Sequence, residues 1–171
     1  MTPLETELKL RIPATAPFPP LLAALGFREA APAQPEHSVL WDRDDALRAA
    51  GSALRTRSYA GAFRLTWKGP RVPDPLLKIR PELETGVTDG AVLEAILTAL
   101  GYQPTLRMEK VRAKWVREDL EACLDETPFG CYLELEGTPA AIAEVRIGLG
   151  LSEDLAEPRS YPELYRLHGL G

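Results

Sequence analysis

The sequence predicts an α+β fold of about eight antiparallel strands and about three helices, with the charged faces of the strands turned into a closed barrel. Two observations favour this fold. Segment after segment alternates between charged and apolar side chains with the two-residue period of a strand. Short runs rich in Gly and Pro separate these segments and suit tight connections. The 171 residues suit a single domain over residues 1–171.

The first strand is expected over residues 5–12. Glu5, Glu7 and Lys9 share one face with Arg11, whereas leucines and an isoleucine occupy the other. Two carboxylates and two cations therefore lie in one row. A strand on a protein surface would alternate in the same way, so it is the recurrence of the pattern along the chain that favours an interior position.

The first half of the chain continues with a helix, a strand, a short helix and a hairpin. Gly26 and Gly51 follow the two helices, because glycine often ends a helix at the C′ position. In the hairpin, Arg55 and Arg57 share one face of the first strand, and Lys68 lies on one face of the second. The expected ranges are 18–25 (helix), 36–42 (strand), 44–51 (helix), and 52–59 with 63–69 (hairpin).

The second half repeats the alternation. Charged residues of both signs, from Lys78 to Glu84, share one face of the strand expected over 76–84. A helical stripe of apolar residues covers 91–100, and Thr138 is a suitable N-cap for a later helix. The remaining expected elements are strands over 105–118, 120–126 and 131–137, a helix over 139–148 and a short helix in the tail.

The direction of the charged faces follows from the helices. Helices that cover a barrel need its apolar faces on the outside, which leaves the charged faces to line the lumen. Cations in a lumen cost many kcal/mol in desolvation unless anions compensate them. A polyphosphate fits the cations, and a hard divalent cation such as Mg²⁺ or Mn²⁺ fits the carboxylates. An open sheet with its charged face in water is the alternative.

Composition argues against several classes of function. The chain has 25 Asp and Glu against 20 Lys and Arg, a net charge of −5, which argues against binding of extended nucleic acid. No apolar run approaches a membrane span, and no basic region precedes an apolar core at the N-terminus. We therefore expect a cytoplasmic protein without membrane association. Cys123 and Cys131 lack the spacing of zinc or redox sites, so free thiols are expected.

Seven short elements in order along the chain carry a resemblance to a known family. They are Glu5-x-Glu7-x-Lys9, Leu54-Arg55-x-Arg57, Lys68, Glu82-x-Glu84, Lys110-x-Arg112, Asp125 and Glu134-x-Glu136, with Ser160-Tyr161 and Leu164 in the tail. Together they resemble the CYTH superfamily, the triphosphate tunnel metalloenzymes. Its members include class IV adenylyl cyclases, thiamine triphosphatases and inorganic triphosphatases. A lone Glu-x-Glu-x-Lys is a weak signal, whereas seven ordered elements over residues 5–136 are a strong one.

The resemblance implies an eight-stranded antiparallel barrel that forms a tunnel and binds a triphosphate. It implies that the triphosphate is bound by Lys9, Arg55, Arg57, Lys68, Lys110 and Arg112, with Arg159 in the tail. It implies metal ligands at Glu5, Glu7, Glu134 and Glu136, with Asp125 nearby. The catalytic group it implies is Glu5, Glu7, Lys9, Glu82 and Glu84, the last two binding a second metal or activating water.

A few positions depart from the family pattern or match nothing firm. Where members often carry Lys, this chain has Arg159, whose guanidinium can meet phosphate but keeps its charge and does not readily donate a proton. Arg64 and Lys114 have the parity of the charged faces, and we interpret them as rim or solvent residues. Arg80 is interpreted either as a tunnel cation or as an ion-pair partner of Glu82.

The expected activity is metal-dependent hydrolysis of the terminal phosphoanhydride of inorganic triphosphate, thiamine triphosphate or a nucleoside triphosphate. The alternative is an adenylyl cyclase, in which the ribose 3′-hydroxyl of ATP attacks the α-phosphorus and pyrophosphate leaves. It would need a nucleoside pocket, which the sequence does not identify. A second alternative is a non-catalytic polyphosphate-binding module, although so many carboxylates would weaken the binding of an anion alone. Both a monomer and a homodimer remain open.

Overall fold

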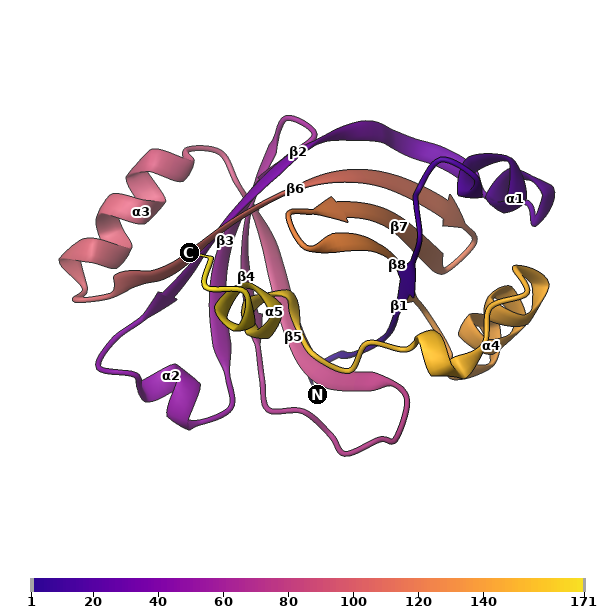
Figure 1. The fold of residues 1–171 in the computed structure, drawn as a ribbon. Helices are drawn as coiled ribbons and strands as arrows, with labels where there is room; N and C mark the ends of the chain where they lie inside the picture. The colour runs from indigo at the N-terminus through magenta and orange to yellow at the C-terminus, as the bar shows by residue number, and fades with distance from the viewer. Residues whose placement is uncertain (1, 171) are drawn as a thin grey trace.

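The computed structural model describes residues 2–170. Its eight strands form a closed antiparallel barrel in the order β1-β5-β4-β3-β2-β6-β7-β8 (Figure 1). The closure confirms the predicted barrel and excludes the open sheet. The strands are β1 (Leu4–Ile12), β2 (Arg28–Asp42), β3 (Ala53–Tyr59), β4 (Ala62–Lys68), β5 (Lys78–Val87), β6 (Gln103–Arg117), β7 (Leu120–Thr127) and β8 (Gly130–Glu136).

A tight turn sets the register of the β3–β4 hairpin. Ala60 and Gly61 form its two-residue loop, and both have positive φ angles, 51° and 73°. This is the backbone of a type I′ turn, whose twist matches that of the flanking strands. The turn pairs Arg55 with Thr66 and Arg57 with Arg64. A slip by one residue would turn both β3 arginines out of the barrel.

The main hydrophobic core lies outside the barrel wall. Helices α1 (Phe18–Ala24) and α4 (Pro139–Gly148) lie beside β1 and β8 (Figure 1). They cover the outward apolar faces of the strands, and burying each such side chain contributes about 1.5–3 kcal/mol. The core therefore confirms that the apolar faces point outward. Its most buried members are Leu8, Leu10, Leu22, Leu133, Leu135, Ile142 and Val145.

The C-terminal helix packs against a second, smaller core. Helix α5 (Tyr161–Leu167) begins with a capping box, in which Ser160 and Glu163 satisfy each other's backbone N–H groups. Tyr165 donates its hydroxyl to the Glu109 carbonyl on β6, and Arg71 holds Glu163 at 2.9 Å. The other helices are α2 (Ala46–Ala49), α3 (Gly90–Ala99) and a 3₁₀ turn (Glu153–Leu155). Among residues 2–170, none of the helices has the length and apolar character of a membrane span.

Two expectations need correction. β2 begins at Arg28 instead of residue 36, because its pairing with β6 shifts register around Ala31 and accommodates Pro32 and Pro35, which lack ladder N–H groups. The described part of the chain contains five α-helices, so the expected total of about three was too low, although each of the five lies at a place where the sequence indicated a helix. The two cysteines are free, as predicted.

Candidate functional site

A cavity of about 1040 Å³ lies within the barrel, and side chains from all eight strands line it. The alternation of each strand points its charged residues inward, so groups distant in sequence meet here. Asp125 and Arg159 are the predicted site residues that do not line it. Those that do are Glu5, Glu7, Lys9, Arg55, Arg57, Lys68, Glu82, Glu84, Lys110, Arg112, Glu134 and Glu136.

The basic side of the cavity is built by β3 and β6. Arg55 and Arg57 come from β3, and Lys110 and Arg112 come from β6. β2 lies between these two strands in the sheet, which brings the four cations across it toward one another. Four cations so close together repel one another, and this arrangement fits an anion that carries several charges.

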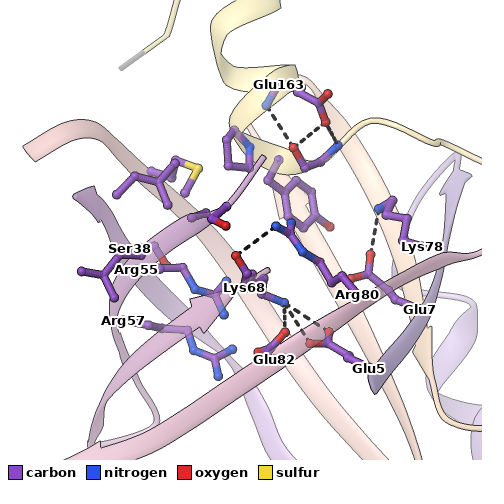
Figure 2. A pocket seen from close by; sticks show the side chains of 18 of the residues that line it. Glu5, Glu7, Ser38, Arg55, Arg57, Lys68, Lys78, Arg80, Glu82 and Glu163 are labelled. Carbon is purple, nitrogen blue, oxygen red and sulfur yellow. Dashed lines mark hydrogen bonds and ion pairs between the residues drawn. The ribbon is translucent and has the colours of Figure 1, made fainter. Parts of the chain in front are cut away.

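Arg55 differs from its neighbours because it has no ion pair or side-chain hydrogen bond with any residue from 2 to 170. Its Nε is buried and unsatisfied, and the Nε of Arg57 is too. Burial and the nearby Arg57 lower the pKa of Arg55. Figure 2 shows both guanidinium groups extending into the cavity. Buried donors without acceptors indicate a place for an anionic ligand.

Asp125 does not line the cavity itself, but it holds the two β6 cations that do, Lys110 and Arg112. Its side chain is fully buried, and it accepts two hydrogen bonds from Arg112 at 2.6 Å and one from Lys110 at 3.0 Å. Tyr161 donates a further hydrogen bond to it. With its oxygens engaged by these donors, Asp125 orients the cations, and its expected place near the metal stays a prediction.

Glu36 is a site residue that the sequence reading missed. It is 3% exposed and lies 3.5 Å from Lys110, 3.6 Å from Arg57 and 3.7 Å from Arg112. Burial opposes its ionisation, but these cations lower the pKa of Glu36 to about 2. The sequence signal that could have identified Glu36 is the two-residue period of the strand, which places it on the same face as Ser38. Glu36 therefore supplies a negative charge among the cations when no ligand is bound.

The acidic side of the cavity comes from β1 and β5. Figure 2 shows Lys68 reaching between Glu5, at 3.0 Å, and Glu82, and shows Glu7 paired with Lys78 at 2.8 Å. Each of the two glutamates of β1 thus forms an ion pair with a lysine, Glu5 with Lys68 of β4 and Glu7 with Lys78 of β5. These pairs are only partly buried, so a more highly charged ligand can exchange with them.

Glu84 and Glu82 occupy the inner face of β5, as the alternation predicted. Glu84 accepts hydrogen bonds from Arg57 at 2.8 Å, Arg64 at 3.0 Å and Thr66 at 2.8 Å. Burial opposes ionisation of Glu84, but Arg57 and the Thr66 hydroxyl lower its pKa. Glu84 therefore remains a carboxylate that orients Arg57 toward the cavity.

Glu136 is the carboxylate whose charge is least compensated. It pairs in register with Glu7 on β1 and with Glu121 on β7, so three carboxylates form a row across the wall. Lys78 and Lys114 pair with the outer two, whereas Glu136 forms no ion pair within the described chain. Burial, which disfavours the charged form, and the negative charges of Glu5 and Glu121 raise the pKa of Glu136 to about 7.

This row fits a divalent cation by its donor chemistry. Carboxylate oxygens are the ligands that Mg²⁺ and Mn²⁺ prefer, and a cation would relieve the repulsion at Glu136. Within residues 2–170, no three His, Cys, Asp or Glu side chains are already gathered at metal-binding distance. Glu5 and Glu7 are instead held by Lys68 and Lys78. Binding would therefore require these side chains to exchange partners.

The charge on Glu136 predicts a pH-dependent stability in metal-free buffer. Its pKa of about 7 in the folded chain exceeds the ordinary 4.5, so between these values the folded state binds more protons and stability falls as pH rises. Glu136→Gln removes this loss. At pH 8 we expect the variant to melt about 2–4 °C above the wild type, a range that allows for partial solvent screening of Glu136. At pH 4.5 we expect the two proteins to melt at the same temperature.

Thermal melting in EDTA across this pH range measures the effect. Glu29→Gln, which changes an exposed glutamate on β2, is the matched control and should follow the wild type at every pH. A constant difference between Glu136→Gln and the wild type would contradict the raised pKa.

Lys9 lies deep in the wall and is 1% exposed. Burial lowers the pKa of Lys9 to about 7, although Glu134 at 3.4 Å acts in the opposite direction. Glu134 also accepts from Arg112, and Lys9 donates to the Arg159 carbonyl at 3.1 Å. Glu134 thus joins a cation of β1 to a cation of β6, and both of its oxygens are engaged.

Arg159 does not reach the cavity through its guanidinium. That group holds Glu157 through two hydrogen bonds, at 2.7 and 2.6 Å, and only its backbone carbonyl meets Lys9. Arg80 lines the cavity, and its guanidinium donates to the Gly69 carbonyl instead of to Glu82. Of the two interpretations of Arg80, the tunnel cation therefore agrees with the structure. The rim position expected for Arg64 agrees with its 47% exposed side chain.

Comparison with known proteins places this architecture in context. The profile of the CYTH domain matches residues 3–161. A relative from Methanocaldococcus jannaschii, named "Putative adenylate cyclase MJ0240", is 30% identical over 172 residues, which cover 94% of this chain and 98% of the relative.

Solved structures share the fold over nearly their whole length. A protein from Vibrio parahaemolyticus, named a "putative adenylate cyclase", superposes with a TM-score of 0.82 at 22% identity, covering 97% of this chain and 99% of that one. A Pyrococcus horikoshii OT3 protein gives 0.79 at 25% identity, covering 96% and 99%. A Hippeastrum protein, described as a "putative adenylyl cyclase" that reveals a dominant triphosphatase activity, gives a TM-score of 0.67 at 18% identity, covering 98% of this chain and 97% of that one.

Proposed function

Because the chain belongs to the CYTH family, we propose that it is a metal-dependent hydrolase of the terminal phosphoanhydride of a triphosphate-bearing small molecule held in the barrel. CYTH proteins bind triphosphate substrates such as ATP and generally use divalent metal ions. The observation that carries the proposal is the division of the cavity into two sides. Within residues 2–170, Arg55 presents donors without a partner on one side, and Glu136 lies in a carboxylate row without an ion pair on the other.

The basic side binds the phosphate chain. Arg55 and Arg57 donate to phosphoryl oxygens from β3, and Lys110 and Arg112 do so from β6. Glu84 already orients the N–H groups of Arg57, and Asp125 already orients those of Lys110 and Arg112. Little reorganisation of these three cations is therefore needed when charge develops on the phosphoryl group. Glu36 repels the incoming chain, and a ligand with several negative charges overcomes this most readily.

The acidic side holds the cation. Glu7 and Glu136 on neighbouring strands, with Glu5, would bind Mg²⁺ or Mn²⁺ through oxygen. Such an ion supplies neutralisation of charge on the phosphate oxygens. Lys68 and Lys78, which now pair with Glu5 and Glu7, would in that case be free to contact the phosphate chain.

The reaction is the attack of water on the terminal phosphorus. A bond forms from the water oxygen to phosphorus while the bond from phosphorus to its bridging oxygen breaks, giving orthophosphate and a diphosphate. The water loses a proton, which passes to solvent or to a carboxylate. Glu82 lines the cavity from the inner face of β5, and we assign to it the orientation of this water.

Turnover of three substrates tests the proposal. Purified protein is incubated with tripolyphosphate, thiamine triphosphate or ATP, each with Mg²⁺ or Mn²⁺, and orthophosphate, pyrophosphate and cyclic AMP are measured. We expect orthophosphate release from at least one substrate and its loss in EDTA. Glu5→Gln should raise the metal concentration needed, whereas Arg57→Ala should raise KM for the substrate. Unchanged kinetics in both variants would remove the site assignment.

The names of the M. jannaschii and V. parahaemolyticus proteins favour a second candidate, adenylyl cyclase. In that reaction the ribose 3′-hydroxyl of ATP replaces water as the nucleophile and pyrophosphate leaves. The same assay separates the two, because cyclic AMP with equimolar pyrophosphate would establish the cyclase. Binding of all three substrates without any product would instead indicate a polyphosphate-binding module.

A further inference from the structure

The ring of Tyr161, the first residue of α5, lies against two lysines of the cavity wall. The Lys9 Nζ is 3.6 Å from the ring centroid, and the Lys110 Nζ is 4.1 Å from it. Both distances are within the range of a cation–π contact, which is worth most when water is excluded. Lys9 comes from β1 and Lys110 from β6, so one aromatic ring joins cations from two separate strands.

Contacts on several sides fix the position of this ring. The Tyr161 hydroxyl donates to Asp125, and the Tyr132 ring packs edge-on at 5.7 Å with an interplanar angle of 84°. The capping box at Ser160 sets the start of α5, and Arg71 holds the first turn through Glu163 at 2.9 Å. The ring is therefore a built part of the cavity wall, contributed by the tail of the chain.

A neutral ring does something that a carboxylate in the same place cannot do. A carboxylate would neutralise each lysine, and an incoming phosphate would have to displace it. The ring attracts both ammonium groups through its quadrupole and adds no negative charge that would neutralise them. With the ring in place, Lys9 also lies 3.4 Å from Glu134 and Lys110 lies 3.0 Å from Asp125. Each ammonium group is therefore held between the ring and a carboxylate, and without the ring the carboxylate alone would set its direction.

We propose that Tyr161 is a positioning residue that holds Lys9 and Lys110 toward the phosphate chain through the face of its ring. This role rests on the proposed function, since it assumes a phosphate chain in the cavity. It also makes α5 a part of the binding site, beyond its contribution to packing. The hydroxyl adds a second, separable effect by bonding Asp125, which in turn orients Arg112.

Two substitutions separate the ring from the hydroxyl. Tyr161→Phe keeps the ring face and removes the hydrogen bond to Asp125, whereas Tyr161→Leu removes both. Tripolyphosphate binding is measured by calorimetry in EDTA, so that the result is independent of turnover. We expect Tyr161→Leu to raise the dissociation constant about tenfold and Tyr161→Phe to raise it by less than about threefold.

Leu164→Ala controls for loosening of the helix. Leu164 is a buried residue of α5 that does not line the cavity, so this variant should lower Tm while keeping the wild-type dissociation constant. Equal affinity of Tyr161→Leu and wild type, equal weakening in Tyr161→Phe and Tyr161→Leu, or a similar loss in Leu164→Ala would each overturn the role of the ring. Failure of the wild type itself to bind tripolyphosphate, both in EDTA and with Mg²⁺, would overturn the proposed function as well.

Discussion

Replacing Arg112 with methionine is expected to lower the free energy of unfolding by about 3–5 kcal/mol, because it leaves buried carboxylates without their main partner. Arg112 is 6% exposed, holds Asp125 through two hydrogen bonds of 2.6 Å and also contacts Glu134. Methionine fills similar space but compensates no charge. Thermal and denaturant unfolding measure the loss, and a fall in Tm of about 10 °C is expected for a chain of this size.

A second substitution identifies the cause of this loss. Asp125→Asn in the Arg112→Met background removes the stranded charge, and we expect it to recover roughly half of the lost stability. Lys114→Met is the matched control on the same strand. Its partner Glu121 is 30% exposed, so its loss should cost less than about 1 kcal/mol. An Arg112→Met cost as small as that of the control would contradict the buried network.

The alternation of side chains in the sequence was enough to predict which face of each strand points inward. Arg55, Lys110 and Glu134 lie on three strands, and each was placed on the correct face by the two-residue period alone. The apolar faces at Leu8 and Leu133 were placed correctly for the same reason. This part succeeded because the period is a local property of the extended backbone.

The pairing of the charges could not be predicted in this way. Parity places Asp125 on the inner face but does not show that Arg112, Lys110 and Tyr161 engage it, since these residues come from another strand and from the tail. Glu36 lay within the strand expected over 36–42 but was missed, because the next residues on its face are Ser38 and Leu40 and do not mark that face as charged. Arg159 lies outside any strand, so periodicity gives no information on where its guanidinium points.

Some cations of the cavity have a carboxylate partner, whereas Arg55 has none within residues 2–170. Replacing Arg55 is therefore expected to lower activity without lowering stability. Arg55→Met removes donors that would contact phosphate, and we expect kcat/KM for the hydrolysed triphosphate to fall about 100- to 1000-fold. The ligand-free protein should not become less stable, because within residues 2–170 no ion pair of Arg55 is lost and a poorly solvated charge is removed. We expect a rise in unfolding free energy of about 1 kcal/mol.

Arg57→Met is the informative comparison, because Arg57 is paired. It holds Glu84 at 2.8 Å and lies 3.6 Å from the buried Glu36, so its removal should reduce both activity and stability. Steady-state kinetics and thermal melting of both variants, without ligand, measure the contrast. A loss of stability in Arg55→Met as large as that in Arg57→Met would mean that Arg55 has a structural role, and unchanged turnover would exclude it from the site. Arg55 has no partner within residues 2–170, so its burial lowers the stability of the ligand-free protein. Its contact with the phosphoryl oxygens offsets this desolvation cost, and it accelerates the reaction to the extent that the contact is stronger in the transition state than in the bound substrate.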